Sequence, residues 1–310
     1  MSRYAVLLMG PTGAGKSELA IRLAELLPLE IVSVDSALVY RQMDIGTAKP
    51  TPQIRARFPH HLIDIRDPAT SYSAGEFTRD AELAMQDIWR RGKQPLLVGG
   101  TMLYFHALTE GLAELPEADL NVRADIDAQA ATSGWAAVHG ELAGVDPAAA
   151  ARIHVNDPQR IQRALEVYRL TGETISELQQ KRASAVADVP VIELALAPLQ
   201  RSALHAAIGA RFEAMLAAGL LEEVRALFRR GDLIAEHPSM RAVGYRQLWR
   251  HLAGQCALEQ AAQQAVAATR QLAKRQLTWL RRRNRALWFD SLEEHISQRV
   301  FHAIRERAGY

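Results

Sequence analysis

The chain has 310 residues, of which 48% are hydrophobic, so it can form one large domain or a main domain with a smaller insert. Lysine and arginine number 37 against 35 acids, a net charge of +2, so a site for a polyanion must come from local clustering. The single cysteine, Cys256, excludes an intramolecular disulfide framework and a zinc site built from thiolates, and no apolar run approaches the ~20 residues of a membrane span. We therefore expect a cytoplasmic protein without a membrane segment.

Apolar runs alternate with glycine-rich or polar loops along the first part of the chain. The periodicity predicts, in chain order, a strand at 4–9, a helix at 17–27, a strand at 31–34, a helix at 73–91 that opens with the capping box Ser73 and Glu76, and a strand at 95–98. Each strand stops in polar or glycine residues, which is where open α/β sheets place their ligands. This segment therefore predicts a site at the carboxyl ends of parallel strands.

The sequence changes character between 116 and 189, where it is alanine-rich and helical. Beyond it we predict a strand at 190–197 and helices at 201–217, 220–229 and 258–283. The predicted fold is α/β, a P-loop NTPase-like parallel sheet flanked by helices, with a mostly α-helical insertion domain and a helical C-terminal region. The predicted domains are a catalytic core at 1–115 and 190–290, an insertion domain at 116–189 and a C-terminal tail at 291–310.

A phosphate-binding loop follows the first predicted strand. The residues from Gly10 to Ser17, GPTGAGKS, match the pattern of a glycine, four residues, a second glycine, lysine and serine or threonine. Glycines let the backbone curl so that its N–H groups point at an anion, and the following helix adds the positive end of its dipole. Lys16 would reach the outer phosphate, and the Ser17 hydroxyl would bind a Mg²⁺ shared with the phosphate oxygens. The loop predicts a diphosphate or triphosphate ligand without saying which.

The strand predicted at 95–98 lacks the acid that an ordinary P-loop NTPase uses. A Walker B aspartate normally follows such a strand and helps to hold the metal, whereas this strand ends in Gly99-Gly100-Thr101. Asp35 is the carboxylate at the tip of a clear strand, and it could be a metal ligand, a general base or a loop cap. Thr101 could equally be the N-cap of the next helix.

A basic stretch lies near the C-terminal end of the chain. It has seven basic residues, no acid and one tryptophan, Trp279; the basic residues are Arg270, Lys274, Arg275, Arg281, Arg282, Arg283 and Arg285. Without acidic partners at i,i+4 spacing, such a stretch suits a phosphate backbone better than a solvated helix face. The insert adds Arg152, His154, Arg160 and Arg163. We therefore expect a second, anionic macromolecule to meet the ligand of the P-loop.

Other polar and aromatic residues are assigned to the fold. The pair His60-His61 has no Asp or Cys nearby at ligand spacing, so a metal site is not expected there. Trp279 and Trp288 are assigned to the core rather than to base stacking. The environment of Tyr245 is left open.

Further motifs follow the P-loop in order: 35–41 (DSALVYR), 43–50 (MDIGTAKP), 59–64 (PHHLID), 99–104 (GGTMLY), 156–166 (NDPQRIQRALE), 243–245 (VGY) and 269–276 (TRQLAKRQ). Together with the P-loop, over roughly 4–290, they resemble the bacterial tRNA dimethylallyltransferase family, also called tRNA isopentenyltransferases. The resemblance implies transfer of a dimethylallyl group from dimethylallyl diphosphate to N6 of the adenosine at tRNA position 37. That adenosine lies beside the anticodon, in tRNAs that read codons beginning with U. It also implies Mg²⁺ as cofactor, the anticodon stem-loop of tRNA as partner, and a monomer.

The resemblance also implies residue roles. Asp35 would be the general base and Thr101 would position the adenine amine. The diphosphate would be held by Gly10, Thr12, Gly13, Ala14, Gly15, Lys16, Ser17 and Arg211, with Ser17 as the metal ligand. The residues that contact tRNA would be Ser36, Ala37, Leu38, Arg123, Gln159, Arg160, Ile161, Gln162, Arg163, Met240, Arg241, Gly244, Tyr245, Lys274, Arg275 and Arg281.

Two other functions fit parts of the pattern. A small-molecule or nucleotide kinase would also use the P-loop, and it would turn over ATP without RNA. An RNA-binding protein gated by a nucleotide would bind tRNA tightly and modify no base. In the prenyl-transfer hypothesis the P-loop holds a leaving group and no phosphoryl group moves, so the missing Walker B acid is no defect.

Overall fold

The structure, a computed structural model, describes residues 3–113, 115–180, 186 and 189–309, and it divides into two compact units. The first unit comprises Met1–Ala107 and Asp188–Tyr310, and the second comprises Leu108–Ala187. The expected insertion domain, 116–189, covers most of the second unit, and its residues 181–185, 187 and 188 lie outside the described part of the chain.

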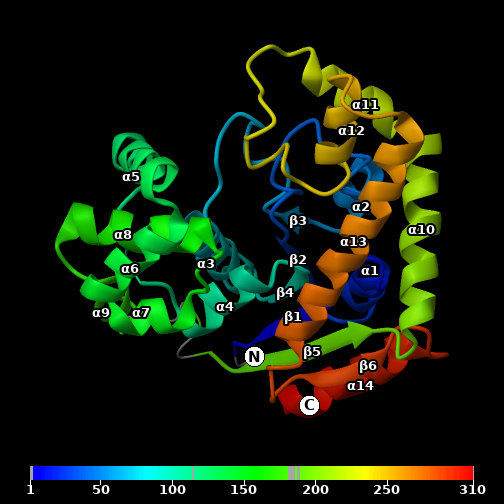
Figure 1. Cartoon of the computed structure of the whole chain (residues 1–310). Helices are drawn as coiled ribbons and strands as arrows, with labels where there is room; N and C mark the ends of the chain where they lie inside the picture. Colours follow the sequence, from blue (N-terminus) through cyan, green and yellow to red (C-terminus); the bar gives the residue numbers. More distant parts are fainter. Residues whose placement is uncertain (1–2, 114, 181–185, 187–188, 310) are drawn as a thin grey trace. The chain divides into compact units, whose positions relative to one another are not determined.

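A six-stranded parallel sheet, as far as the chain is described, forms the centre of the first unit in the order β3-β2-β4-β1-β5-β6 (Figure 1). The strands are β1 (Ala5–Met9), β2 (Leu29–Val34), β3 (His60–His61), β4 (Gln94–Gly99), β5 (Val191–Ala197) and β6 (Leu287–Asp290). The four predicted strands are confirmed, and β3 and β6 are additions too short to show a period of their own. Strands β1, β2 and β4 are buried along their whole length, as expected of parallel strands with both faces covered.

Helices make up most of the rest of the first unit. They are α1 (Lys16–Leu26), α2 (Pro52–Arg57), α3 (Ala74–Arg90), α10 (Arg201–Ala217), α11 (Leu220–Phe228), α12 (Tyr245–Leu252), α13 (Leu258–Leu280) and α14 (Ile296–Ala308). Helix α4 (Met102–Glu110) begins in the first unit and ends in the second. The predicted capping box of α3 is present, because Glu76 N–H donates to Ser73 Oγ at 3.1 Å and Ser73 N–H donates to Glu76 Oε2 at 2.8 Å.

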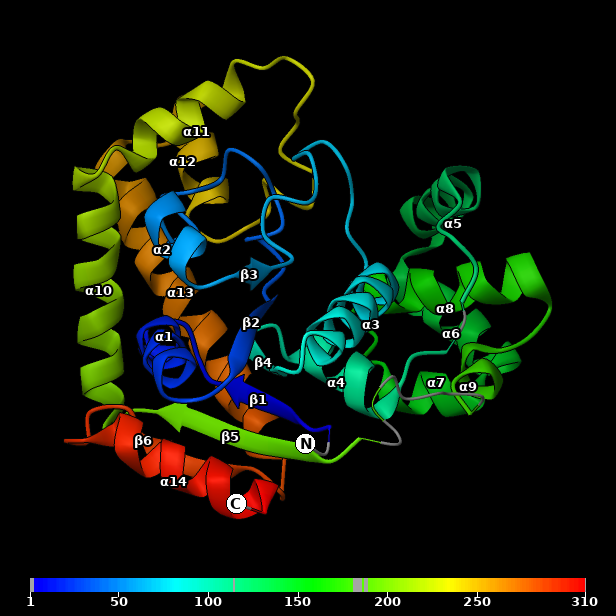
Figure 2. The same cartoon turned by 180° about the vertical axis from the view of Figure 1, so that it is seen from behind.

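The C-terminal tail belongs to the core of the first unit. Helix α14 lies along β5 and β6 in Figure 2, and its Val300 and Ile304 are fully buried. They pack in one apolar cluster with Leu23 of α1 and with alternate residues of the strands, among them Val6 and Ile192. The residues beyond 290, to which the sequence assigned no role, therefore close one face of the sheet.

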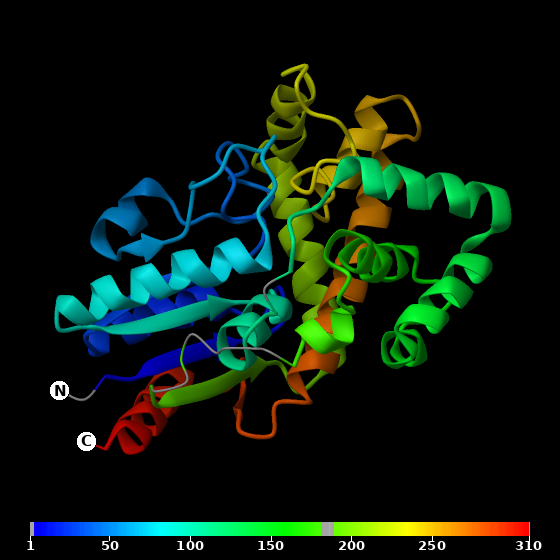
Figure 3. The ribbon, with the colours of Figure 1, turned by 90° about the vertical axis from the view of Figure 1, so that its left-hand side faces the viewer.

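Helices α10 and α13 lie side by side (Figures 1 and 3) and share a small apolar cluster of Leu204, Ile208 and Ala273. Among the described residues, no single helix is both long enough and apolar enough to cross a membrane. The bent pair α10 and α11, which meet at 64°, passes that test only when taken together and only on length and composition.

The second unit is a helical cluster with its own apolar core. Its helices are α5 (Leu120–Ser133), α6 (Trp135–Val145), α7 (Pro147–Arg152), α8 (Pro158–Thr171) and α9 (Ile175–Leu178). Helix α8 shows the usual start and stop signals, because Asp157 caps its first turn, Pro158 opens it, and Gly172 ends it at a φ of 74°. Its inner face, including Ile161 and Leu165, is fully buried.

A buried carboxylate, Glu166, joins α8 to the start of α5. It accepts hydrogen bonds from Arg123 Nε at 2.8 Å, from Arg163 at 2.6 Å and from the Asp119 N–H at 2.9 Å. These donors hold the pKa of Glu166 below its usual value, against the opposing effect of burial. Glu166 therefore stabilises the folded second unit as a charged group.

We predict that Glu166→Gln weakens the second unit by about 1.5–3 kcal/mol, because a buried carboxylate loses its charge-assisted hydrogen bonds while its partly exposed arginines can turn to water. Hydrogen exchange of α5 and α8 amides in the full chain measures the change, and Asp125→Asn, an exposed acid on α5, is the control. A carboxylate with a lowered pKa stabilises above its unfolded value of about 4.3 and loses this effect as pH falls through the folded pKa. The wild type should therefore lose protection at acidic pH more steeply than Glu166→Gln, and equal pH profiles would contradict the prediction.

Candidate active site

The site begins where three neighbouring strands end. Strands β2, β4 and β1 are adjacent and parallel, so the turn after Asp35, the loop from Gly99 to Thr101 and the P-loop meet at one edge of the sheet. Gly99 lies against β2 so closely that a Cβ would stand 1.9 Å from the carbonyl oxygen of Val34. Only glycine allows this approach, which brings Thr101 beside the Asp35 turn.

The P-loop has the backbone of an anion cradle. Gly13 and Gly15 have φ angles of 82° and 77°, in the left-handed region that favours glycine. Helix α1 begins directly after Gly15, which has no side chain to cap it, so the first N–H groups of the helix remain available for a ligand. Within the protein, the Lys16 ammonium donates to the carbonyl oxygen of Pro11 at 2.7 Å.

Two cations and one carboxylate dominate the electrostatics of the cradle. Burial lowers the pKa of Lys16 to about 8, an effect that Asp35 opposes and Arg211 reinforces. Burial also lowers the pKa of Arg211, again opposed by Asp35. Arg211 comes from α10, far along the chain, and it lines the same cavity as the P-loop. The charged forms of both cations would be favoured by an anionic ligand between them.

Asp35 caps its own turn, which is one of the roles considered for it. Its Oδ1 accepts from the backbone N–H groups of Ala37 at 2.8 Å and Leu38 at 3.2 Å, so it caps its own turn. Its Oδ2 has no hydrogen-bond partner among the described residues and is free to accept a proton. Thr101 Oγ1 accepts from the Ser36 N–H at 3.1 Å, so its hydroxyl is tied to the same turn.

Gln276 of α13 links the P-loop to the loop after β4. Its Oε1 accepts from the Thr12 N–H at 2.9 Å, and its Nε2 donates to the carbonyl oxygen of Gly100 at 2.9 Å. A Cβ on Gly100 would stand 2.4 Å from that nitrogen, so the contact requires glycine. Gln276 belongs to the 269–276 motif and was expected on the RNA side, so its contact with the P-loop was not predicted; its helical spacing from the buried Ala273 and Leu280 places it on the inner face of α13.

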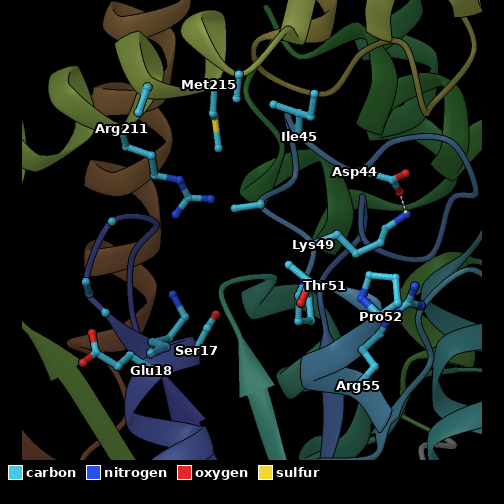
Figure 4. A pocket seen from close by; sticks show the side chains of 18 residues that line it. Ser17, Glu18, Asp44, Ile45, Lys49, Thr51, Pro52, Arg55, Arg211 and Met215 are labelled. Atoms are coloured by element: carbon cyan, nitrogen blue, oxygen red, sulfur yellow. Dashed lines mark hydrogen bonds and ion pairs between the residues drawn. The ribbon is translucent and has the colours of Figure 1, made fainter.

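A cavity of about 710 Å³ opens beside the cradle (Figure 4). The P-loop and the start of α1 form one wall, the loop from Asp44 to Pro52 with Arg55 forms a second, and α10 forms the third. Figure 4 shows Arg211 and Met215 projecting from α10 and Ile45 from the facing loop. The cavity therefore has a charged end at the P-loop and an apolar stripe along α10, and the facing loop carries Asp44 and Lys49 besides Ile45.

The basic face of α13, by which we mean Lys274, Arg275 and Arg281, is exposed as predicted. None of the three has a carboxylate within 4.0 Å among the described residues, whereas Arg283 is paired with Glu193 at 2.9 Å. Trp279 and Trp288 are 40% and 45% exposed, so their assignment to the core was wrong. Trp279 instead lies on the same helix as the unpaired cations.

The other residues expected to contact tRNA fall into three groups. Exposed or partly exposed are Ser36, Ala37, Leu38, Gln159, Arg160, Gln162 and Arg241. The side chains of Ile161, Met240 and Tyr245 are fully buried, and Gly244 is buried as well, so no direct side-chain contact with RNA is open to them in this structure. Arg123 and Arg163 are engaged by Glu166. The pair His60-His61 forms β3, and no cluster of three metal-binding side chains occurs among the described residues.

Comparison with known proteins identifies the family. A family model described as IPP transferase matches residues 38–283, and one described as isopentenyl transferase matches 3–57. The tRNA dimethylallyltransferase of Nitrosococcus oceani is 58% identical over 295 residues, which cover 95% of this chain and 94% of the relative. That of Bordetella petrii is 56% identical over 303 residues, which cover 97% of this chain and 96% of the relative.

Solved structures agree in fold. The tRNA isopentenylpyrophosphate transferase from Bacillus halodurans superposes with a TM-score of 0.72 at 34% identity, and the match covers 99% of both chains. A eukaryotic dimethylallyltransferase acting on tRNA gives a TM-score of 0.84 at 26% identity and covers 99% of this chain and 80% of that one. With one family model across most of the sequence and relatives of more than half identity along nearly all of it, this chain belongs to the IPP transferase family.

Proposed function

We propose that this protein transfers a dimethylallyl group from dimethylallyl diphosphate to N6 of the adenosine at tRNA position 37, with release of diphosphate. The observation that carries the proposal is an anion cradle with two cations, Lys16 and Arg211, beside a carboxylate, Asp35, that has one free oxygen. The relatives named tRNA dimethylallyltransferase support the reaction class and the tRNA substrate. We also propose that the tRNAs are those that read codons beginning with U, and that the enzyme acts in the cytoplasm as a monomer, since one chain supplies cradle, carboxylate and basic face.

The cradle would act on the leaving group. As the bond between the allylic carbon and the diphosphate breaks, negative charge grows on the bridging oxygen. The N–H groups of the P-loop and the Lys16 and Arg211 cations then stabilise this charge, and each such donor is typically worth ~100 to ~1,000-fold in rate. The phosphates stay in place and only the prenyl group moves.

Mg²⁺ fits this arrangement through Ser17. The Ser17 hydroxyl is exposed and lines the cavity next to Lys16, and no cluster of three acidic, histidine or cysteine side chains is present among the described residues. The protein would therefore supply the Ser17 hydroxyl, and the ligand would supply phosphate oxygens. A bound Mg²⁺ would neutralise charge on the diphosphate.

Asp35 would act on the nucleophile. The exocyclic amine of adenine is a poor nucleophile because its lone pair is delocalised into the ring, so a proton must leave as the C–N bond forms. Asp35 Oδ1 is fixed by two N–H groups, which orients Oδ2 as the proton acceptor. Thr101, tied to the same turn, would help to position the amine. The base must leave its stack to reach the site, which costs least from a single-stranded loop.

The kinase alternative is not favoured. Strand β4 ends in Gly99 and Thr101 follows without an acid, so a Walker B ligand is missing from the place where a phosphoryl transferase needs one. The test incubates the protein with dimethylallyl diphosphate, Mg²⁺ and unmodified tRNA and analyses the nucleosides by mass spectrometry. We expect N6-(dimethylallyl)adenosine; its absence, with tRNA that a known enzyme can modify, would refute the proposal.

Asp35→Asn should retain tRNA affinity and lose turnover by ~100 to ~10,000-fold, because the amide can keep the turn but cannot take the proton. Single-turnover kinetics with saturating donor and tRNA measure the chemical step, and filter binding measures tRNA affinity. Equal turnover in the two proteins would remove Asp35 as the base.

Donor binding should weaken with rising pH. The free Lys16 has a pKa of about 8 and a neighbouring diphosphate raises it, so binding above that pH takes up a proton. Affinity for dimethylallyl diphosphate should fall by up to about 10-fold per pH unit above the free pKa. Titration calorimetry in two buffers of different ionisation enthalpy measures the proton uptake. Two results would contradict this role of Lys16. One is donor binding without proton uptake, and the other is a donor affinity that falls with pH as steeply in Lys16→Arg as in the wild type.

The basic face of α13 should contribute salt-dependent affinity for tRNA. Replacing Lys274, Arg275 and Arg281 together by alanine should weaken tRNA binding and lower the slope of log K against log salt by about two to three. The KM for dimethylallyl diphosphate should stay the same. Arg307→Ala, which removes an exposed arginine from α14, is the control, and a slope like that of wild type in the triple variant would place the RNA elsewhere.

A further inference from the structure

We propose that Glu223 and Tyr245 are positioning residues for the prenyl donor. Together they fix the loop that forms one wall of the cavity, and thereby set donor affinity and the length of prenyl chain that fits. This inference rests on the proposed function and names a specificity device within the same site. It moves Tyr245 from an expected RNA contact to a donor-side role.

Glu223 of α11 receives four hydrogen bonds. Its Oε2 accepts from the N–H groups of Asp44 at 2.8 Å and Ile45 at 2.7 Å, and its Oε1 accepts from the Gly46 N–H at 3.1 Å and from the Tyr245 hydroxyl at 2.5 Å. Three successive backbone N–H groups thus wrap one carboxylate, as in the nests that bind free anions. We call this set of contacts the Glu223 clamp.

The loop in the Glu223 clamp also lies directly against Tyr245. The Tyr245 side chain is fully buried, and a Cβ on Gly46 would stand 2.5 Å from its ring. Burial and the neighbouring Glu223 carboxylate raise the pKa of Tyr245, so its hydroxyl stays a proton donor to Glu223. The Tyr245 ring therefore limits how closely Gly46 can approach it, and the Glu223 carboxylate fixes the orientation of the N–H groups of the loop.

The same loop is held from its other end by Lys49. Its ammonium, only 2% exposed, donates to Asp44 at 2.5 Å, to Asp64 at 2.6 Å and to the carbonyl oxygen of Tyr40 at 2.9 Å. Its three protons are thereby used inside the protein. Lys49 lines the cavity but has no N–H left to donate to a ligand, so its role is to stabilise the wall.

The wall faces a stripe of α10 that runs away from the cradle. Arg211, Ala214, Met215 and Ala218 line the cavity at helical spacing, so one face of α10 passes from a cation to apolar residues over about 10 Å. A diphosphate held by Arg211 would leave its prenyl group beside Met215, opposite Ile45, and Figure 4 shows these two side chains entering the cavity from different elements. Ile45, placed by the Glu223 clamp, and Met215 then limit the chain to a short one.

Glu223→Gln tests the inference in the full chain. The amide would direct an N–H group at backbone N–H donors, so the loop loses its fixed position. The KM for dimethylallyl diphosphate should rise about 10-fold to about 100-fold, and the preference for dimethylallyl over geranyl diphosphate in kcat/KM should fall at least about 10-fold. The KM for tRNA should change less than about two-fold, because loss of the clamp alters the donor cavity. Glu222→Gln is the matched control, since its acid lies on the same helix, is 69% exposed and, within the described part of the chain, pairs with Arg225 alone.

The KM and kcat values distinguish a positioning role of Glu223 from a purely structural one. A purely structural role would reduce the folded fraction, so kcat would fall while both KM values and the donor preference stayed the same, and that result would overturn the inference. If Glu223→Gln does not fold, Tyr245→Phe keeps the ring against Gly46 and removes one donor, and it should shift donor KM in the same direction by a smaller factor. An unchanged donor KM in Tyr245→Phe would then reject the clamp. If wild type itself transfers no prenyl group, the proposed function fails instead.

Discussion

The positive charge of Lys16 is the constraint around which the site is organised. Its ammonium is desolvated enough to lower its pKa to about 8, with Arg211 nearby and Asp35 as the neighbouring carboxylate. Holding the Lys16 charge away from water costs free energy when the site is empty, and a bound anion offsets that cost. The parallel sheet makes it possible, because β1, β4 and β2 end at one edge and bring the P-loop, Thr101 and Asp35 together.

The C-terminal half of the chain completes a site that the N-terminal half begins. Helix α10 supplies Arg211, α13 supplies Gln276 and the exposed basic face, and α11 with α12 supplies the Glu223 clamp. Each contributes a contact to a loop that follows a strand, so the helices act as a rigid frame for loops that would otherwise be free. One frame thus serves both a charged cradle and an apolar wall, which is what a prenyl diphosphate requires.

Local patterns made part of this predictable. The P-loop, the strands around it and the position of Asp35 all follow from periodicity and from glycine spacing within a few residues. Gln276 and Glu223 could not be found in that way, because they contact Thr12 and Asp44 across 264 and 179 positions, and a single polar residue on a buried helix face has no local signature. Met240 and Tyr245 look like any motif residue in the sequence, and only packing shows that they are buried. The short β6 likewise depends on pairing with β5, which the sequence does not display, whereas Ile296, Val300 and Ile304 lie at helical spacing and α14 could have been predicted.

In the proposed mechanism the cradle stabilises the departing diphosphate while the carboxylate beside it deprotonates an adenine. The most direct measurement counts products: inorganic diphosphate formed per modified adenosine, with dimethylallyl diphosphate, Mg²⁺ and tRNA supplied, in parallel with ATP in place of the prenyl donor. We expect one diphosphate for each modified adenosine and no orthophosphate from ATP. ATP hydrolysed, or its terminal phosphate transferred, at a rate above that of prenyl transfer would contradict it.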